Sequence, residues 1–494
     1  MEKGEQANLK AEVADHDRAA LNSSIVSWDT AEDPKNPKNW PTKKKWRMTL
    51  IVSCFAFLSP LTGTMISPST AAIGVSLHTD DFVRIELVMS IFLLGIGFGP
   101  LVLGPLSEMN GRVPVLLYGN LFFILWNTVC GFSRNLGELT AFRLLSGFGG
   151  SAPLAVGGGL LSDLWRPEER GRALAIYTAG PLLGPAIGPI IGGYITQRAT
   201  WRWVFWAVSI ASACFEILAF SFLKETHPPK LLDQKRKQLQ KETGDLNLRT
   251  EYDSSDRTVT KLLRTNLVRP IRMISTQIII QVLSIYMAVL YGIMFLVLFT
   301  FPLLWKNVYH QSVSTGSLNY ISTGVGYTLG AQAGGALNDW IYAKLKSRNN
   351  DVGTPEFRVA LMVPGSILIP IGLFIYGWTG QYHTHWIAPN IGVAVFCMGT
   401  IMCFQGIQTY TIDAYSRYAA SAISTLNALR SLTGFTFLLF APTMYDKLGY
   451  GWGNSVLAFV LVGCVVVSIA IFVPAALWKY GASLRKRSTY ASGD

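Results

Sequence analysis

The stretch Gly180-Pro-Leu-Leu-Gly-Pro-Ala-Ile-Gly-Pro-Ile-Ile-Gly-Gly193 sets repeated glycines and prolines in an apolar context. Inside a soluble helix each glycine costs about 1 kcal/mol and each proline about 3 kcal/mol relative to alanine, which would favour a loop. The apolar character, however, extends from Ala173 to Ile195, far enough to cross a bilayer core. Because a loop would leave backbone groups unpaired in hydrocarbon, we expect a membrane helix, bent at its prolines and closely packed at its glycines.

The whole chain has the composition of a protein with many membrane spans. Hydrophobic residues make up 50% of the 494 residues, charged residues only 15%, and the mean hydropathy is +0.33. Soluble proteins rarely combine these values. Apolar windows of roughly 20 residues predict twelve spanning helices, at residues 50–72, 86–106, 113–132, 138–162, 171–195, 203–223, 279–301, 316–338, 358–378, 386–409, 418–441 and 454–477.

A polar segment, residues 224–272, divides these spans into two sets of six. We therefore expect an all-α membrane protein with twelve transmembrane helices in two pseudo-symmetric six-helix bundles. Residues near 230–242 are predicted to form a short helix, either solvated or lying on the anionic inner leaflet. The predicted organisation is a tail at 1–49, a bundle at 50–223, a linker at 224–278, a bundle at 279–478 and a tail at 479–494.

Lysine and arginine are distributed unequally between the two sides of the predicted membrane. One side holds the basic run Lys43-Lys44-Lys45, the linker and Arg485 to Arg487. The positive-inside rule places this side and both termini in the cytoplasm. Topology thus accounts for the formal net charge of +12, and no nucleic-acid partner is expected.

Cysteine and histidine give no sign of a metal or redox site. All six cysteines lie inside predicted spans without metal-ligand spacing. The six histidines lie in tails or loops, away from any candidate nucleophile. We therefore expect neither an enzyme nor a protein with a metal or cofactor, and a seven-helix receptor would not contain two related sets of six spans.

The two halves carry related motifs at corresponding places. Gly104-Pro-Leu-Ser-Glu108-Met-Asn-Gly-Arg112 follows the second span, and Gly335-Ala-Leu-Asn-Asp339 follows the eighth. Each places a glycine and an acid at a cytoplasmic helix end. Such an echo is typical of a duplicated six-helix unit.

These motifs resemble those of the fungal twelve-spanner drug:proton antiporters, within the major facilitator superfamily. Gly104 to Arg112 is similar to the loop-2/3 motif, although Val113 stands where a second basic residue is usual. Leu139 to Gly149, around Arg143, is similar to the fourth-span motif. Further similarity to the fungal branch lies in Asp33-Pro-Lys-Asn-Pro-Lys-Asn-Trp40, Trp201-Arg-Trp203, Glu225-Thr226 and Asp413-Ala-Tyr415.

The opening stretch resembles the antiporter motif of the fifth span. Its glycines are expected to receive a helix of the other half, and its prolines to fix a bend that seals the seam against leak. Simple helix packing would use the same residues. The motif consists of Gly180, Pro181, Gly184, Pro185, Gly188, Pro189, Gly192 and Gly193.

Five charged residues are candidates for proton coupling and for a conformational latch. Arg143 would lie about 9 Å inside the membrane, where a guanidinium costs roughly 2.5 to 3.5 kcal/mol and needs a wet cavity or backbone carbonyls. Glu108 and Arg112 are predicted to pair across their turn, with Asp163 nearby, although solvated helix-cap charges would fit the same pattern. Glu216, placed as the one acid well inside the bilayer, is either a proton carrier or a hydrogen-bonded structural carboxyl.

The resemblance implies a substrate cavity between the first, fourth, seventh and tenth helices. Methionine and aromatic side chains there would accept amphipathic molecules of varied shape, although most membrane aromatics only pack. In the eleventh span Arg430 needs a partner, for which Asp413 or a backbone carbonyl is a candidate. The candidate cavity residues are Thr62, Met65, Tyr286, Tyr291, Met294, Phe295, Gln405, Gln408 and Asn427.

The expected function is secondary active transport. A proton-coupled efflux pump would export a hydrophobic or amphipathic small molecule, such as a drug, toxin or secondary metabolite, by alternating access at a midplane site. The alternative is a proton-coupled or facilitated uptake transporter of an organic nutrient. The expected setting is a monomer in the plasma membrane whose partners are the substrate, protons and lipid.

Overall fold

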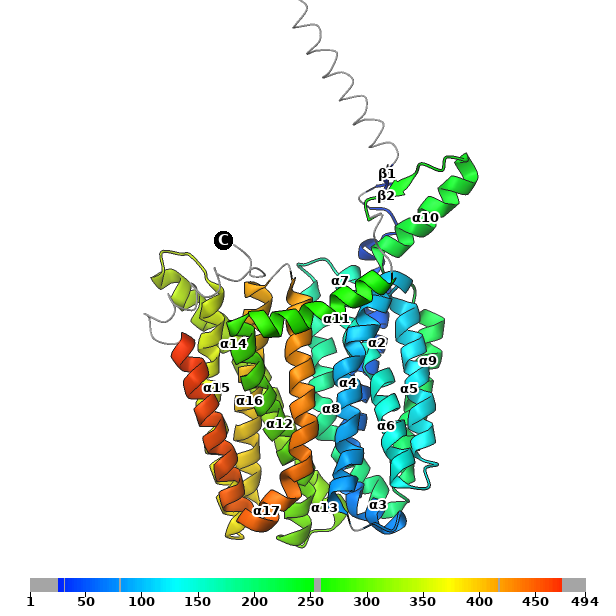
Figure 1. The fold of residues 1–494 in the computed structure, drawn as a ribbon. Coiled ribbons are helices and arrows are strands. Elements are labelled where there is room, and N and C mark those ends of the chain that lie inside the picture. Colours follow the sequence, from blue (N-terminus) through cyan, green and yellow to red (C-terminus); the bar gives the residue numbers. More distant parts are fainter. Residues whose placement is uncertain (1–24, 31, 80, 253–258, 416–417, 473–494) are drawn as a thin grey trace, which may run out of the picture.

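The computed structural model describes residues 25–30, 32–79, 81–252, 259–415 and 418–472, which are almost entirely helical (Figure 1). Within these ranges one sheet is present, in which β1 (Ile25–Val26) pairs in parallel with β2 (Arg249–Thr250). Because β2 belongs to the predicted linker, this pairing ties the N-terminal segment to the linker.

The first half contains six spanning segments, each matching a predicted span. The fourth consists of two helices that meet at Ser151, and α3 (Thr70–Ser76) follows the first through the 3-10 turn Ser67–Ser69. The first begins before the predicted residue 50, since the basic run is itself helical. The segments are α2 (Thr42–Met65), α4 (Phe82–Asn110), α5 (Arg112–Cys130), α6 (Leu136–Gly150) with α7 (Ala152–Leu164), α8 (Arg170–Arg198) and α9 (Arg202–Phe222).

The second half repeats this arrangement. Its last helical segment comprises two helices that meet at Gly449, where φ is 68° and ψ is 177°. The short helix α13 (Val313–Leu318) and the 3-10 helix Pro355–Leu361 lie between spans. The spanning helices are α12 (Ile278–Asn307), α14 (Tyr320–Arg348), α15 (Met362–Gln381), α16 (Ile387–Ala414) and α17 (Ala419–Phe472).

Twelve spans follow from these helices. Ten described helical segments are long and apolar enough to cross a membrane. The division of α17 at Gly449 adds an eleventh. The twelfth is α14, which has 29 residues but is rich in small and polar side chains. The predicted fold class is therefore confirmed.

Two linker helices mark one end of the molecule, called here the linker end. The first, α10 (Pro228–Thr243), confirms the helix predicted near 230–242. The second, α11 (Val259–Thr276), lies across this end in Figure 1 and packs on α4, α12 and α17, so it bridges the two halves. The opposite end, with α3 and α13, is called the distal end. The charge distribution predicts that the linker end is cytoplasmic.

The two halves contact each other at the distal end. The Ser67 hydroxyl donates to the Phe299 carbonyl at 3.3 Å, and the backbone N–H of Ser314 donates to Gln197 Oε1 at 2.8 Å. The largest buried apolar cluster also crosses the seam, because Leu93 of α4 belongs to it together with the core of the second half. The distal end is therefore closed in this structure.

Candidate functional site

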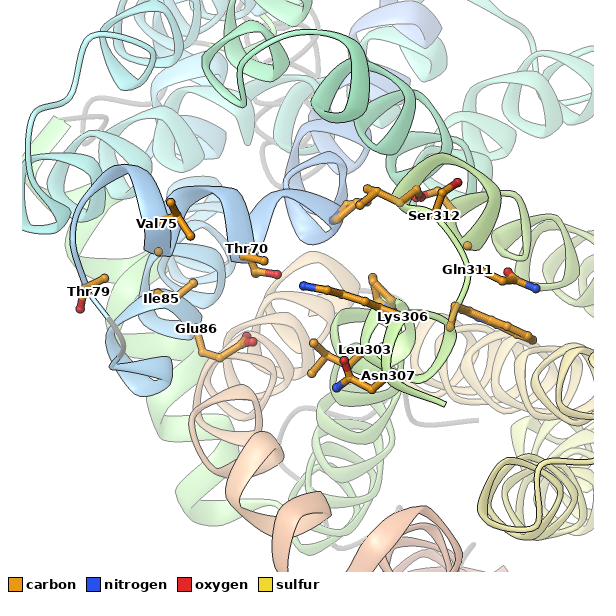
Figure 2. A pocket seen from close by; sticks show the side chains of 18 residues that line it. Thr70, Val75, Thr79, Ile85, Glu86, Leu303, Lys306, Asn307, Gln311 and Ser312 are labelled. Atoms are coloured by element: carbon orange, nitrogen blue, oxygen red, sulfur yellow. The ribbon is translucent and has the colours of Figure 1, made fainter. Parts of the chain in front are cut away.

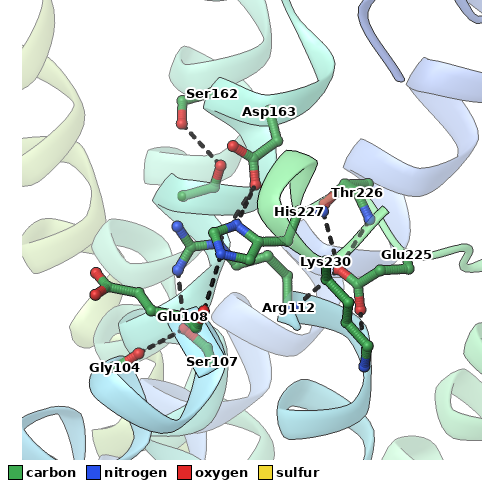
Figure 3. Close-up of polar contacts among 11 residues, drawn as sticks. Gly104, Ser107, Glu108, Arg112, Ser162, Asp163, Glu225, Thr226, His227 and Lys230 are labelled. Atoms are coloured by element: carbon green, nitrogen blue, oxygen red, sulfur yellow. Dashed lines mark hydrogen bonds and ion pairs between the residues drawn. The ribbon is translucent and has the colours of Figure 1, made fainter. Parts of the chain in front are cut away.

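Arg112, the first residue of α5, is the centre of a polar network at the linker end (Figure 3). Its Nε lies 3.3 Å from Asp163 Oδ2, and its Nη1 donates to the Ser107 hydroxyl at 2.8 Å. The two charged side chains are 15% and 14% exposed, so water screens their attraction less than it screens a surface pair. Because Asp163 lies near the end of α7, the pair ties the fourth span to the turn between the second and third.

Gly111, which separates α4 from α5, lies against the carboxylate of Glu225. Glu225 Oε1 accepts hydrogen bonds from the backbone N–H groups of Arg112, Thr226 and His227, each at 2.9 Å. The N–H of Arg112 belongs to the first turn of α5, where no intrahelical acceptor exists. Glu225 thus caps α5 from the segment that follows the sixth span.

The network continues onto the start of α10. His227 Nε2 forms a 3.0 Å hydrogen bond with the backbone carbonyl of Glu108, and His227 Nδ1 lies 3.9 Å from Asp163. Lys230 Nζ lies 3.9 Å from Glu225 Oε2. The linker is therefore fastened to the same turn that carries Arg112.

The predicted pairing of Glu108 with Arg112 is not the one that forms. Arg112 pairs with Asp163, while the Glu108 side chain is exposed and has no ion pair among the described residues (Figure 3). The sequence indicates Glu225 only as part of a fungal pattern, and His227 only as one of the loop histidines. Their position directly after the sixth span, at the same membrane end as Gly111, was the available signal.

Arg143 of α6 is completely buried in the first half. Its guanidinium makes long hydrogen bonds, 3.4 Å each, to the carbonyls of Val88, Thr62 and Gly63, and lies 4.3 Å from the ring centre of Phe92. In this conformation it has the surroundings of a structural arginine bound to carbonyls, which was one of its two predicted settings.

Glu216 of α9 is also buried, between α5 and α9. Asn120 Nδ2 donates to its Oε2 at 2.6 Å, and the Ser212 hydroxyl donates to Asn120 Oδ1 at 3.0 Å. Its second oxygen has no hydrogen-bond partner in the described part of the chain. A partly satisfied carboxyl of this kind suits either predicted role, as proton carrier or as structural group.

The glycines of α8 pack chiefly against α2 of the same half. Gly180, Gly184, Gly188 and Gly192 recur every four residues and so share one face; a Cβ on Gly188 would lie 2.6 Å from the Leu61 carbonyl oxygen. The expectation that they receive a helix of the other half is wrong for these four. Only Gly193 among the motif glycines lies against the second half, at Ser317 of α13.

The motif prolines do not interrupt α8. Pro181, Pro185 and Pro189 all lie within this one 29-residue helix. They occupy a helix whose glycine face is held against α2, so tertiary packing overrides their low helix propensity.

The candidate cavity residues occupy different surroundings. Thr62 and Met65 are buried on α2, where the Thr62 hydroxyl donates to its own helix at Leu58. Tyr286 is buried within the second half, hydrogen-bonded to Ser366 at 3.0 Å and to Cys403 at 3.3 Å.

An aromatic row on α12 lies closer to the seam between the halves. Tyr291 and Phe295 are 4.6 Å apart between ring centres, and Met294 beside them is 5% exposed. The guanidinium of Arg430 lies 4.8 Å from the Tyr291 ring centre. Half-buried polar side chains nearby in the second half are Gln405, which donates to the Ala331 carbonyl, Gln408 and Asn427.

Asp413, one of the two candidate partners predicted for Arg430, pairs with Arg358 instead. Arg358 Nε lies 3.1 Å from Asp413 Oδ2, and its Nη1 lies 3.1 Å from Asp339 Oδ1. Asp339 belongs to the motif that echoes Glu108. The second half thus has its own charge cluster at the linker end.

Comparison with known proteins agrees with this architecture. A family model described as Major Facilitator Superfamily matches residues 52–438. The chain is 48% identical over 477 residues to "Efflux pump vrtL" of Penicillium aethiopicum, covering 97% of this chain and 93% of that protein. It is 38% identical over 471 residues to "Efflux pump radE" of Floropilus chiversii, covering 94% and 86%.

Solved structures with the same fold include transporters of distant sequence. The xylose transporter XylE from E. coli, in a partially occluded inward open conformation, matches with a TM-score of 0.63 at 15% identity, over 88% of this chain and 98% of that one. A bacterial homolog of the human lysosomal transporter Spinster matches with a TM-score of 0.62 at 13% identity, over 91% and 99%.

Proposed function

The chain belongs to the Major Facilitator Superfamily, and we propose that it is a proton-coupled efflux pump that exports an amphipathic small molecule. The observation that carries the direction of transport is the similarity to a fungal protein named as an efflux pump, which is 48% identical over 97% of this chain. A second relative with the same designation supports it.

Side chains near the seam between the halves support the proposed substrate class. Tyr291, Met294 and Phe295 give α12 a cluster of aromatic and thioether side chains, which is buried in this conformation, and the Arg430 guanidinium lies 4.8 Å from the Tyr291 ring centre. Such side chains bind apolar rings by area and repack for different shapes. A hydrophobic metabolite or drug with a polar or anionic group fits this chemistry better than a sugar.

Transport would proceed by alternating access. In the arrangement described, the distal end is closed by contacts such as Ser67 with Phe299. Opening that end requires the halves to rock, and the Arg112–Asp163 network at the linker end holds the first half's helix ends together while they do. Glu216 and Arg143 remain the candidates for proton coupling, through a carboxyl that can titrate and a guanidinium that can change partners.

The test uses a yeast strain that lacks its own drug pumps and expresses this chain at the plasma membrane. Cells are loaded with the diacetate ester of fluorescein, which releases an amphipathic anionic dye inside the cell, and dye release into a buffered medium is followed with and without a protonophore. We expect efflux above that of empty-vector cells, and its loss when the protonophore collapses the gradient. Efflux that continues after collapse would remove proton coupling, and dye accumulation would favour the uptake alternative.

A further inference from the structure

A cavity of about 300 Å³ lies at the distal end, between the two halves (Figure 2). The first half contributes the end of the first span, α3 and the first turns of α4, and the second half contributes the end of α12 and α13. Its walls therefore separate when the halves rock open at this end. Its outer lining, such as Val75, is exposed, whereas a buried group of its inner lining is enclosed in this conformation and would meet the distal solution when the halves separate.

One carboxyl points into this cavity, and the sequence did not single it out. Glu86 of α4 is 4% exposed, and its Oε2 has no hydrogen-bond partner in the ranges that the structure describes. Figure 2 shows its side chain extending towards the second half. An ionised carboxylate enclosed without a partner is costly, whereas a protonated carboxyl is tolerated.

The charged groups around Glu86 do not neutralise it in this structure. Lys306 of α12 lines the same cavity, but the described residues contain no ion pair between the two. Asp81 and Arg84, at the start of α4, pair with each other at 3.0 Å on the surface. Tyr320 of α14, a further titratable group near Glu86, directs its hydroxyl to the Leu298 carbonyl.

We propose that Glu86 is a proton-binding residue of the distal gate, which takes up one proton from the distal solution when the gate closes and releases it to that solution when the gate opens. The carboxylate accepts the proton and forms an O–H bond, and no other reactant is needed. Because the site opens only to the distal side, it does not carry the proton across the membrane. Acid on that side favours the closed gate, and with it the state that would load substrate from the cytoplasm.

The inference rests on the alternating access of the proposed function, but not on its substrate or its driving gradient. Gate opening can therefore be measured without transport. Ser317 is 1% exposed and lines the cavity, so a cysteine there is reached by a membrane-impermeant maleimide only when the gate opens. Ser76, exposed at the end of α3, gives a matched reference that corrects for the effect of pH on the labelling chemistry.

The experiment labels Ser317→Cys in intact cells at an external pH of about 5 and of about 8, relative to Ser76→Cys and to the parent chain. We expect relative labelling to be about threefold slower in acid. Glu86→Gln, which mimics the protonated form, should give slow labelling at both pH values. Glu86→Asp, which keeps the acid, should retain the dependence, and so should Lys306→Met.

Two results would overturn the proposal. In the first, the pH dependence persists in Glu86→Gln at normal surface expression. In the second, Glu86→Gln and Lys306→Met both speed labelling, as expected if an ion pair between them closes the gate. If Glu86→Gln does not reach the surface, Glu86→Asp decides, since loss of the pH dependence there with normal expression also contradicts the proposal. Failure of proton-driven dye efflux would leave the labelling result unchanged, so the two proposals fail separately.

Discussion

Glu225 fills the space beside Gly111 that a side chain at position 111 would need, since a Cβ there would overlap its carboxylate. Gly111 also has a φ of 94° and a ψ of 160°, a backbone region open essentially to glycine alone. Two separate constraints, one from the backbone and one from packing, thus require glycine between α4 and α5.

The first prediction is that Gly111→Ala destabilises the protein strongly. The backbone strain alone should cost about 1 to 3 kcal/mol, and displacement of Glu225 would also uncap α5. Thermal unfolding in detergent, followed by size-exclusion chromatography, measures the loss. Gly104→Ala is the matched control in the same motif, because a Cβ there meets nothing within 4 Å. Equal unfolding temperatures for both variants would contradict the role of Gly111.

The second prediction concerns the Arg112–Asp163 pair. Because each side chain is the other's ion-pair partner, Arg112→Gln and Asp163→Asn should each lower the unfolding temperature, and the double variant should lose less than the sum. Glu108→Gln should leave it unchanged, since Glu108 is exposed and outside this pair. Additive losses would show that the two residues act independently.

Gly111 also explains why the wrong acid was assigned to Arg112. In an unbroken helix, Glu108 and Arg112, which are four residues apart, would be neighbours across one turn. The helix breaks at Gly111, so Arg112 begins a new helix and is directed towards α7. Periodicity predicts neighbours only while the helix continues.

The glycine face of α8 illustrates a second limit. A four-residue spacing identifies the face that packs closely, and the structure has that face in close contact. The spacing carries no information on which helix lies opposite, and the neighbour is α2. Glu86 was missed for a related reason: it lies at the edge of a predicted span, where a charge is expected to be solvated, and only the approach of the second half buries it.

The spans themselves were predictable because each depends on composition over about 20 residues. The spanning part of the fold, with the short helix α10, was therefore available from the sequence. The bridging helix α11 was not, because its charges place it in the polar linker and its packing on α4 and α17 depends on how the halves meet.

A third prediction concerns the buried pair of Asn120 and Glu216. Glu216→Leu leaves the Asn120 amide without its acceptor, which should cost about 1 to 3 kcal/mol. Glu216→Gln keeps an acceptor oxygen and should cost less. Thermal unfolding ranks the variants, and a smaller loss in the leucine variant would show that the hydrogen bond does not stabilise the bundle.

The same pair separates a structural Glu216 from a proton carrier. If Glu216 carries a proton, Glu216→Gln should fold normally yet lose the external-pH dependence of dye efflux. Retention of that dependence in a folded protein would assign Glu216 to structure alone.

A fourth prediction concerns Asp33, in the segment before α2. The backbone N–H of Lys35 donates to Asp33 Oδ1 at 2.8 Å, and that of Asp29 to Oδ2 at 3.1 Å. These bonds favour the charged form and hold the pKa of Asp33 below its ordinary value of 3.8. The charged carboxylate therefore stabilises the folded segment around Asp33 at pH values above 3.8. This contribution is lost as the pH falls through the pKa of the folded state.

Limited proteolysis of the detergent-solubilised protein tests this. Near neutral pH, Asp33→Asn should be cut faster than the parent chain in the segment between Ile25 and Trp40. With an acid protease at a pH below the lowered pKa, the two chains should be cut at similar rates. A difference that persists in acid would mean that Asp33 acts through its shape and not its charge.

The last prediction uses the contact between α8 and α2. A Cβ on Gly188 would lie 2.6 Å from the Leu61 carbonyl oxygen and 2.7 Å from Thr64 Oγ1, so one of the helices must shift in Gly188→Ala. On the same helix, a Cβ on Gly171 meets nothing within 4 Å. In an isolated helix both changes would stabilise, since alanine exceeds glycine by about 1 kcal/mol in helix propensity. We therefore expect Gly171→Ala to raise the unfolding temperature slightly and Gly188→Ala to lower it.

Dye efflux should fall in Gly188→Ala alone, because α2 also supplies the carbonyls of Thr62 and Gly63 that hold Arg143. Equal behaviour of the two variants would mean that α8 tolerates a displaced α2, and the close packing of the glycine face would then have no part in stability or transport.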